Sequence, residues 1–185
     1  MLARLYAAWQ DNRKAWNGFR AFTQLPAEQK RIVFYAESAA DWAFLEPVAA
    51  ELERNNCPVY RICSDPNDPA LKEPRAYYVG SGTPRTVLFR TLEAERFIMT
   101  LSDLETYHLK RSVHPVHYFY IFHSIASTHR VYRLHAFDAY DTILCAGPHQ
   151  EREIRLTEKV YNLPPKRLMP HGYGRLDTLL SDLHQ

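Results

Sequence analysis

Short apolar runs alternate along the chain with longer segments whose apolar residues recur at helical spacing. An apolar run of about five residues is typical of a buried strand, and apolar residues three or four positions apart are typical of a helix that packs on one face. Ser38 is suited to begin a helix, in which Pro47 indicates a kink or a late start. This pattern predicts strands at 31–36, 59–63, 76–79, 97–101, 118–122, 142–146 and 167–169, and helices at 2–24, 39–54, 84–92, 149–161 and 175–183.

The alternation of strands and helices predicts an α/β fold in which a parallel sheet has helices on both faces. The strands are continuous apolar runs, as expected where both faces of a sheet are covered. In such sheets ligands bind beyond the carboxyl ends of the strands, near a switch in strand order. The residues that follow the predicted strands are therefore candidate ligand contacts: Glu37, Ser38, Ser102, Asp103, His123, Ser124, Gly147 to His149, His171 and Gly172.

The predicted N-terminal helix is amphipathic and basic, and we treat residues 1–30 as a helical segment that precedes an α/β domain at 31–185. Leucine and aromatic residues repeat along it at helical spacing, and residues 1 to 31 hold six Lys or Arg against two acidic residues. Such a helix could lie on an anionic membrane surface. The alternative is a helix that packs on its own domain and leaves its charges in solvent.

Composition limits the class of protein. A chain of 185 residues with 46% hydrophobic and 24% charged residues is typical of one soluble globular domain. Three cysteines without a CxxC pair fit a reducing cytoplasm. No apolar run reaches the ~18 residues of a spanning helix, and no secretory signal is seen at the N-terminus.

Acidic residues are absent from residues 106–137, which hold six histidines and four Lys or Arg. The net charge is only +2, so any preference for anions must come from local clustering of this kind. Within this window Arg130 and Arg133 could bind a phosphate in bidentate fashion. The alternative is a solvated helix face.

His123 is the candidate catalytic residue. It stands where the predicted strand 118–122 ends, so its ring would project into the ligand crevice. There an imidazole could take a proton from a hydroxyl nucleophile at neutral pH. The alternative is a histidine that is merely hydrogen-bonded in a loop. The spacing of the histidines does not suit a zinc site, and we expect neither a metal nor a cofactor.

The loop between the last predicted strand and the last helix is a further candidate. His171, Gly172 and Arg175 belong to it, and its glycines allow unusual backbone angles next to a helix start that favours anions. The chain has no P-loop, no dinucleotide fingerprint and no GxSxG elbow. It also lacks a stacking motif for nucleic acid, so no nucleic-acid partner is expected.

One group of motifs in the second half of the chain resembles a known family. The motifs are Phe122-His123-Ser124, Tyr140 to Pro148, Glu151 to Arg155, Leu163-Pro164 and His171 to Asp177. In this order they resemble the CDP-glycerol glycerophosphotransferases, the teichoic-acid polymerases and primases of bacterial envelopes. The chain departs from the family pattern at Ser124, where glycine is usual, and at Gly174, where proline is usual.

The resemblance implies a GT-B transferase, of which this chain would be the Rossmann-like, acceptor-binding N-terminal half. His123 would be the base, and Glu37, Ser38, Ser124, Arg130, Arg133, His149, His171, Gly172 and Arg175 would line the substrate site. A CDP-glycerol or nucleotide-sugar donor would bind a second domain, so the isolated chain should not turn over. The acceptor would be phosphorylated or lipid-linked, which places the protein in the cytoplasm or on the inner membrane face.

Two other interpretations stay open. One is a non-catalytic Rossmann-like module that binds a phosphorylated ligand or a partner protein. The other is a fragment of a GT-B epimerase that acts on nucleotide sugars, which would need the second domain as well.

Overall fold

The structure is a computed structural model that describes residues 2–183, apart from the side chains of residues 3, 4, 177, 178, 181 and 182. Its strands are β1 (Ile32–Ala36), β2 (Val59–Cys63), β3 (Ala76–Tyr78), β4 (Arg96–Met99), β5 (His117–Ile121), β6 (Thr142–Cys145) and β7 (Arg167–Pro170). Its α-helices are α1 (Leu2–Thr23), α2 (Trp42–Arg54), α3 (Thr83–Thr91), α4 (Thr128–Val131), α5 (Pro148–Tyr161) and α6 (Gly174–Leu183), and its 3₁₀-helices are η1 (Ala39–Asp41) and η2 (Pro69–Lys72).

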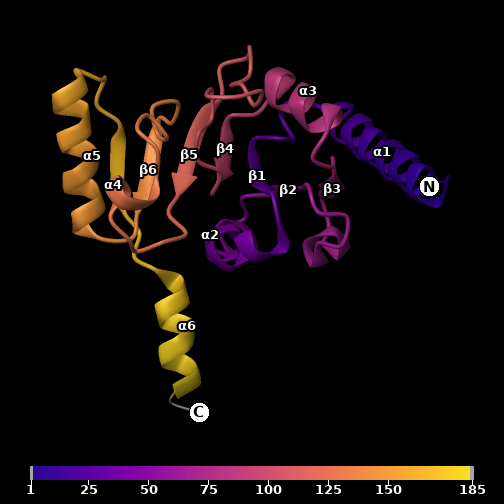
Figure 1. Cartoon of the computed structure of the whole chain (residues 1–185). Helices are drawn as coiled ribbons and strands as arrows, with labels where there is room; N and C mark the ends of the chain where they lie inside the picture. Colours follow the sequence, from indigo (N-terminus) through magenta and orange to yellow (C-terminus); the bar gives the residue numbers. More distant parts are fainter. Residues whose placement is uncertain (1, 184–185) are drawn as a thin grey trace.

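The strands form one seven-stranded sheet in the order β3-β2-β1-β4-β5-β6-β7 (Figure 1). Every neighbouring pair is parallel, so the α/β Rossmann-like fold predicted from the sequence is confirmed. The chain builds outward from β1 to β3, crosses back to β4, and then builds outward in the other direction. The strand order therefore switches between β1 and β4, where the crevice of such a sheet lies.

Helices cover both faces of the sheet, as predicted. Phe22 of α1, Leu88 of α3 and Ile154 of α5 join one hydrophobic cluster with side chains of the strands. Leu45 and Ala49 of α2 join a second cluster. Each large side chain fully buried in this way stabilises the fold by roughly 1.5–3 kcal/mol. The predicted helix 39–54 begins late, because a 3₁₀ turn at Ala39–Asp41 precedes α2.

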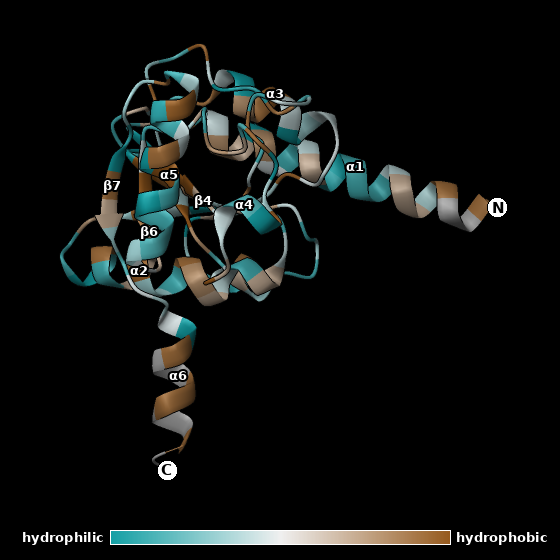
Figure 2. Ribbon diagram, turned by 60° about the vertical axis from the view of Figure 1, so that its left-hand side comes forward, coloured by the Kyte–Doolittle hydropathy of each residue, from teal (hydrophilic) through white to brown (hydrophobic). Residues whose placement is uncertain are grey.

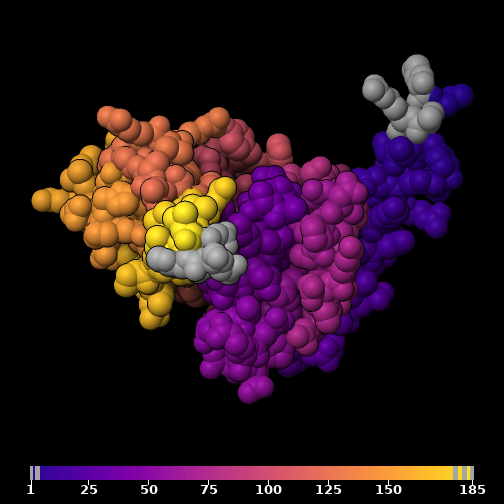
Figure 3. Space-filling view, turned by 90° about the horizontal axis from the view of Figure 1, so that it is seen from below, coloured from indigo at the N-terminus to yellow at the C-terminus, as the bar shows by residue number. Residues whose placement is uncertain are grey.

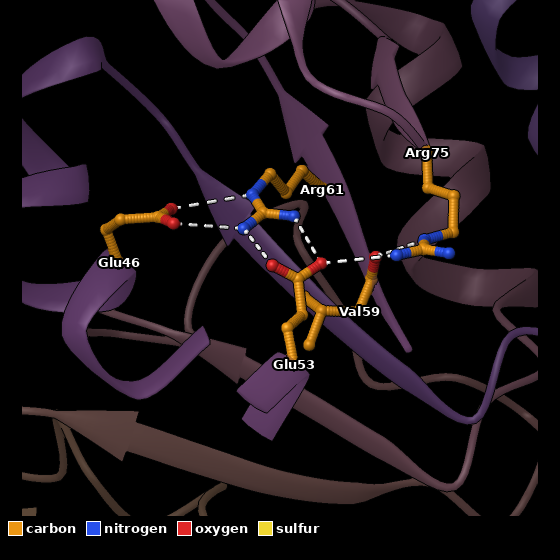
Figure 4. Close-up of polar contacts among 5 residues, drawn as sticks. All are labelled: Glu46, Glu53, Val59, Arg61 and Arg75. Atoms are coloured by element: carbon orange, nitrogen blue, oxygen red, sulfur yellow. Dashed lines mark hydrogen bonds and ion pairs between the residues drawn. The ribbon is translucent and has the colours of Figure 1, made fainter. Parts of the chain in front are cut away.

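A charged cluster fastens α2 to the sheet (Figure 4). Arg61 on β2 has a side chain that is only 3% exposed, and its guanidinium lies 3.0 Å from a carboxylate oxygen of Glu46 and 3.0 Å from one of Glu53. Arg75 adds a hydrogen bond of 3.2 Å from its Nε to the carbonyl oxygen of Val59 and approaches Glu53 at 3.4 Å. Because both glutamates belong to α2, the cluster fixes this helix over β2.

The second half of α1 packs on the edge of the domain. A Cβ on Gly18 would lie 1.9 Å from the carbonyl oxygen of Tyr78, so only glycine allows this close approach. The hydroxyl of Tyr78 donates a 2.7 Å hydrogen bond to the Asp11 carboxylate. Phe22, near the end of the helix, is buried. These contacts join α1 to β3.

The two terminal helices both project from the domain (Figures 1 and 2). Exposed apolar side chains follow helical spacing on the first half of α1 and again along α6. On α1 they are Leu2, Leu5, Tyr6 and Trp9, and on α6 they are Leu176, Leu179, Leu180 and Leu183. No helix among the described residues has the length and apolar character needed to cross a bilayer.

Candidate active site

Asp41 links the two strands at the switch point. Its Oδ2 accepts hydrogen bonds from the backbone N–H of Glu37 at 2.9 Å and of Ser38 at 2.8 Å. Its Oδ1 accepts a 3.0 Å hydrogen bond from the hydroxyl of Thr100, the residue after β4. One carboxylate therefore holds the loop that follows β1 against the end of β4.

His123 lies beside this link, two residues beyond the end of β5, and is half-buried. A hydrogen bond joins its ring to the backbone of Thr100. Its Nδ1 is 3.4 Å from the hydroxyl oxygen of Tyr120, near the long limit for a hydrogen bond. The rings of Phe44 and Tyr132 each lie with their centroid 6.1 Å from that of His123. The imidazole is thus held from several sides at the carboxyl edge of the sheet.

Burial lowers the pKa of His123 below its ordinary value of 6.5, because an imidazolium is poorly solvated in this position. The negative charge of Asp41 and the hydrogen bond to the Thr100 backbone oppose this effect and raise the pKa. The balance leaves the ring neutral at pH 7. A neutral imidazole can accept a proton, and the nearby carboxylate favours the charged form that results.

A small cavity opens next to His123. The segment after β7 brings Tyr173 over the site, where its hydroxyl donates a 3.4 Å hydrogen bond to the His123 carbonyl and its ring lies 5.7 Å from that of Phe44. Gly172 has a φ of +79°, a left-handed value that glycine adopts without strain. The cavity has a volume of about 210 Å³ and is lined by Ala43, Phe44, Pro47, Phe122, His171, Gly172, Tyr173 and Gly174.

Seen from below, α6 stands at this carboxyl edge, between α2 on one side and the segments from the second half of the chain on the other (Figure 3). His171 and Gly172, two of the residues predicted to contact substrate, line the small cavity. Arg175 is exposed on the first turn of α6.

Glu37 and Ser38 also lie at the switch point, but both are already engaged. The Glu37 carboxylate accepts a 2.7 Å hydrogen bond from Arg85, whose side chain is only 9% exposed. Arg85 donates a second hydrogen bond, of 3.1 Å, to the hydroxyl of Tyr35. Ser38 contributes its backbone N–H to Asp41. The Glu37 side chain is half exposed, so a substrate could reach it only alongside its arginine partner.

Ser124 and His149 shape the loop that follows β5. The Ser124 hydroxyl accepts a 3.1 Å hydrogen bond from the N–H of Ala126, and its carbonyl accepts one of 2.7 Å from the Gln150 amide. The Nε2 of His149 is 2.9 Å from the carbonyl oxygen of Ile125. Through these contacts both residues stabilise the segment that follows His123.

Arg130 and Arg133 are two further predicted substrate contacts. Both are exposed, Arg130 within α4 and Arg133 just after it, and the Arg133 guanidinium stacks 5.4 Å from the ring centre of Tyr107. In the described part of the chain the hydrogen-bond and ring partners of His123 include neither arginine. The structure therefore does not bring the predicted arginines and the predicted base together.

Several bases of residues 106–137 have carboxylate partners in the structure. The window lacks acidic residues in the sequence, but folding brings carboxylates from outside it against its bases. The pairs are Lys110 with Glu105, Arg111 with Asp141, His114 with Glu93 and His135 with Asp138. In addition, His117 lies at the start of β5, at the opposite edge of the sheet from His123.

Sequence reasoning missed Asp41, Thr100 and Arg85. A readable signal existed for Asp41, because serine followed three residues later by a carboxylate is typical of a helix start. Thr100 and Arg85 gave no such signal, since their positions depend on which strands become neighbours. No group of three or more metal-binding side chains is found among residues 2–183 where side chains are described.

Comparison with protein-family models, with curated proteins and with solved structures finds no match to the chain.

Proposed function

We propose that the chain is the acceptor-binding half of a GT-B-type transferase similar to the CDP-glycerol glycerophosphotransferases. The observation that carries this proposal is the His123 imidazole, neutral at pH 7 and oriented by the Thr100 backbone at the carboxyl edge of a Rossmann-like sheet. The motif resemblance at residues 122–124 and 171–177 supports it, because both segments meet at this crevice. Ligands of such sheets bind at this edge.

The proposed reaction moves a glycerophosphate group from CDP-glycerol to a hydroxyl of the acceptor. The acceptor oxygen attacks the phosphorus that bears glycerol, the bond from that phosphorus to CMP breaks, and the hydroxyl proton passes to His123. Thr100 keeps the ring in place, and Asp41 stabilises the imidazolium that forms. General base catalysis of this kind typically contributes about 10²–10⁴-fold to a rate.

The donor would bind to a second domain that faces the crevice, as in other GT-B transferases. The small cavity beside Phe44 and Tyr173 could take part of the acceptor, but at about 210 Å³ it is too small for a nucleotide-activated donor as well. The proposal therefore expects this domain to bind acceptor without turnover by itself.

The first half of α1 supports a peripheral position on the inner membrane face, close to a lipid-linked acceptor. Its exposed Leu5 and Trp9 form an apolar surface, and Arg13, Lys14 and Arg20 are exposed bases farther along the helix. Apolar and basic side chains together favour an anionic lipid surface.

A transfer assay with radiolabelled CDP-glycerol and a glycerophosphate-primed acceptor tests the function. The isolated chain is expected to transfer nothing, and the domain joined to a donor-binding domain is expected to transfer label to the acceptor. Robust turnover by the isolated chain would contradict the division into halves. Absence of transfer in the joined protein, with the donor shown to bind, would contradict the function itself.

A further inference from the structure

A second cavity is lined by Tyr132, a residue that also contacts His123. It has a volume of about 140 Å³ and lies between the segment that follows α4 and helix α5. Its lining includes Thr128, His129, Tyr132, Arg133, Asp138, Thr157, Glu158 and Lys166. The ring of Tyr132 lines the cavity and also contacts the His123 ring, with 6.1 Å between their centroids. The cavity therefore adjoins the candidate active site.

The carboxylates that line the cavity already have partners. One Glu158 oxygen accepts a 2.8 Å hydrogen bond from the backbone N–H of Lys166, and the other accepts one of 2.7 Å from Arg155. The Asp138 carboxylate lies 2.7 Å from Nδ1 of His135. Both carboxylates of the lining therefore already accept hydrogen bonds.

The Lys166 ammonium has no such partner. The residue is only 7% exposed, and its side chain makes no hydrogen bond or ion pair with any residue whose side chain the structure describes. Buried lysines are rarely found unpaired. Among the described residues, Nε of Arg85 is the only fully enclosed side-chain nitrogen or oxygen that lacks a hydrogen-bond partner. Because the Lys166 ammonium also lacks a partner but is not in this class, it still reaches solvent. Lys166 lines the cavity, which is where a partner can approach it.

Other donors accompany this lysine. Arg133 and His129 also line the cavity, and Arg133 has no ion pair within the described residues, where it only stacks on Tyr107. Glu153 is close by, but its Oε2 accepts hydrogen bonds from both the N–H and the hydroxyl of Thr128 at 2.6 Å. The lining therefore carries the bases Arg133 and Lys166 together with the hydrogen-bonded carboxylates of Asp138 and Glu158, and a volume of about 140 Å³ holds several water molecules or one phosphate group.

We propose that this cavity binds the phosphate group of a small phosphorylated molecule, with the Lys166 ammonium as its main charge partner. Arg133, whose planar guanidinium suits bidentate contact with phosphate, closes the outer side. The identification of that molecule as the acceptor rests on the proposed function: its phosphate would occupy the cavity, and its hydroxyl would extend past Tyr132 to His123.

Isothermal titration calorimetry with inorganic phosphate and with glycerol 3-phosphate tests the inference. Lys166→Gln should weaken the binding of both about tenfold or more, because a charge-assisted hydrogen bond is lost. Lys159→Gln is the matched control, since Lys159 is exposed on α5 and does not line the cavity. Backbone amide shifts of the unmodified chain on addition of phosphate should concentrate at residues 128–138 and 157–166, which locates the site without any substitution.

Three results would overturn the inference: no binding of either compound at millimolar concentration, equal binding by Lys166→Gln and the unmodified chain, or shifts confined to residues 171–174. Phosphate binding that persists in His123→Ala supports the cavity even where no transfer is detected. The inference and the proposed function can therefore fail separately.

Discussion

At the scale of single residues, the protonation state of the His123 ring decides whether the crevice can accept a proton from a bound hydroxyl. Its ring is buried enough to stay neutral, and the Thr100 backbone and the Asp41 carboxylate both favour the imidazolium once a proton arrives. Asp41 also holds Thr100 by a 3.0 Å hydrogen bond. The same carboxylate therefore positions the orienting residue and stabilises the charged base.

NMR titration of the His123 ring is expected to show a midpoint below 6.5, because burial lowers its pKa. Asp41→Asn should lower the midpoint further, since a charge that raises the pKa is removed. The folded protein then binds fewer protons than the unfolded chain as pH falls through 6.5, so the free energy of unfolding should decrease there. A His123 midpoint above 6.5 would contradict the assignment of a neutral base.

The sequence predicted His123 because a histidine directly after an apolar run must lie at a strand tip. It could not predict Thr100, whose contact with the ring requires β4 and β5 to be neighbours. Nor could it predict that Asp141 and Glu93 approach Arg111 and His114, because these contacts form only on folding. Contacts between residues that are far apart in the sequence cannot be predicted from the apolar and polar pattern of one short segment.

At the scale of elements, the predicted strands and helices are confirmed, with boundaries shifted by one or two residues except at the late start of α2. The strands were readable because strands covered on both faces are continuous apolar runs. The short helix α4 was missed, since four residues give no helical period. Helix α1 packs on β3 through its second half, and the apolar side chains of its first half are exposed.

Replacing the carboxylates around Arg61 should weaken the packing of α2 on the sheet and lower the stability of the fold. Glu53→Gln is expected to lower the free energy of unfolding by about 1–3 kcal/mol, and Glu46→Gln by less, because Glu46 is more exposed. The double variant leaves a buried guanidinium unpaired and should cost about 3 kcal/mol or more. Urea denaturation measures these differences.

Glu51→Gln on the same helix is the control, because Glu51 is exposed and its carboxylate contacts the exposed side chains of Arg54 and Asn55. A change within about 0.5 kcal/mol is expected there. The hydrogen bond from Arg61 lowers the pKa of Glu53, so the stability that Glu53 supplies is present above its ordinary pKa and lost as pH falls through the lowered value. A Glu53→Gln variant as stable as the unmodified chain would show that the cluster does not fasten α2.

Helix α1 should bind anionic vesicles through its first half. Trp9 is 55% exposed, so its fluorescence should shift to shorter wavelength when phosphatidylglycerol vesicles are added, and Trp9→Phe should remove that shift. Leu5→Glu should weaken binding in a sedimentation assay, because a charge enters the apolar surface. If the chain sediments equally with neutral and anionic vesicles, or with neither, the proposed binding of α1 to an anionic membrane surface is wrong.

At the scale of the whole molecule, the fold gathers separate segments of the chain at one edge of the sheet. Asp41 follows β1, Thr100 follows β4, His123 follows β5 and Tyr173 follows β7. Helix α6 leaves the domain at the same edge (Figure 3). The phosphate-sized cavity adjoins this edge through Tyr132. A donor domain that approaches the edge would meet the base and the bound acceptor together.

The most direct measurement is the transfer rate of His123→Ala in a protein that joins this domain to the donor-binding domain that the proposed function requires. With CDP-glycerol as donor, the rate should fall about 10²–10⁴-fold, while the circular dichroism spectrum stays unchanged. His108→Ala, which removes an exposed histidine that lines neither cavity, should transfer within about twofold of the unmodified protein. A His123→Ala variant that transfers at the unmodified rate would show that this imidazole is not the base.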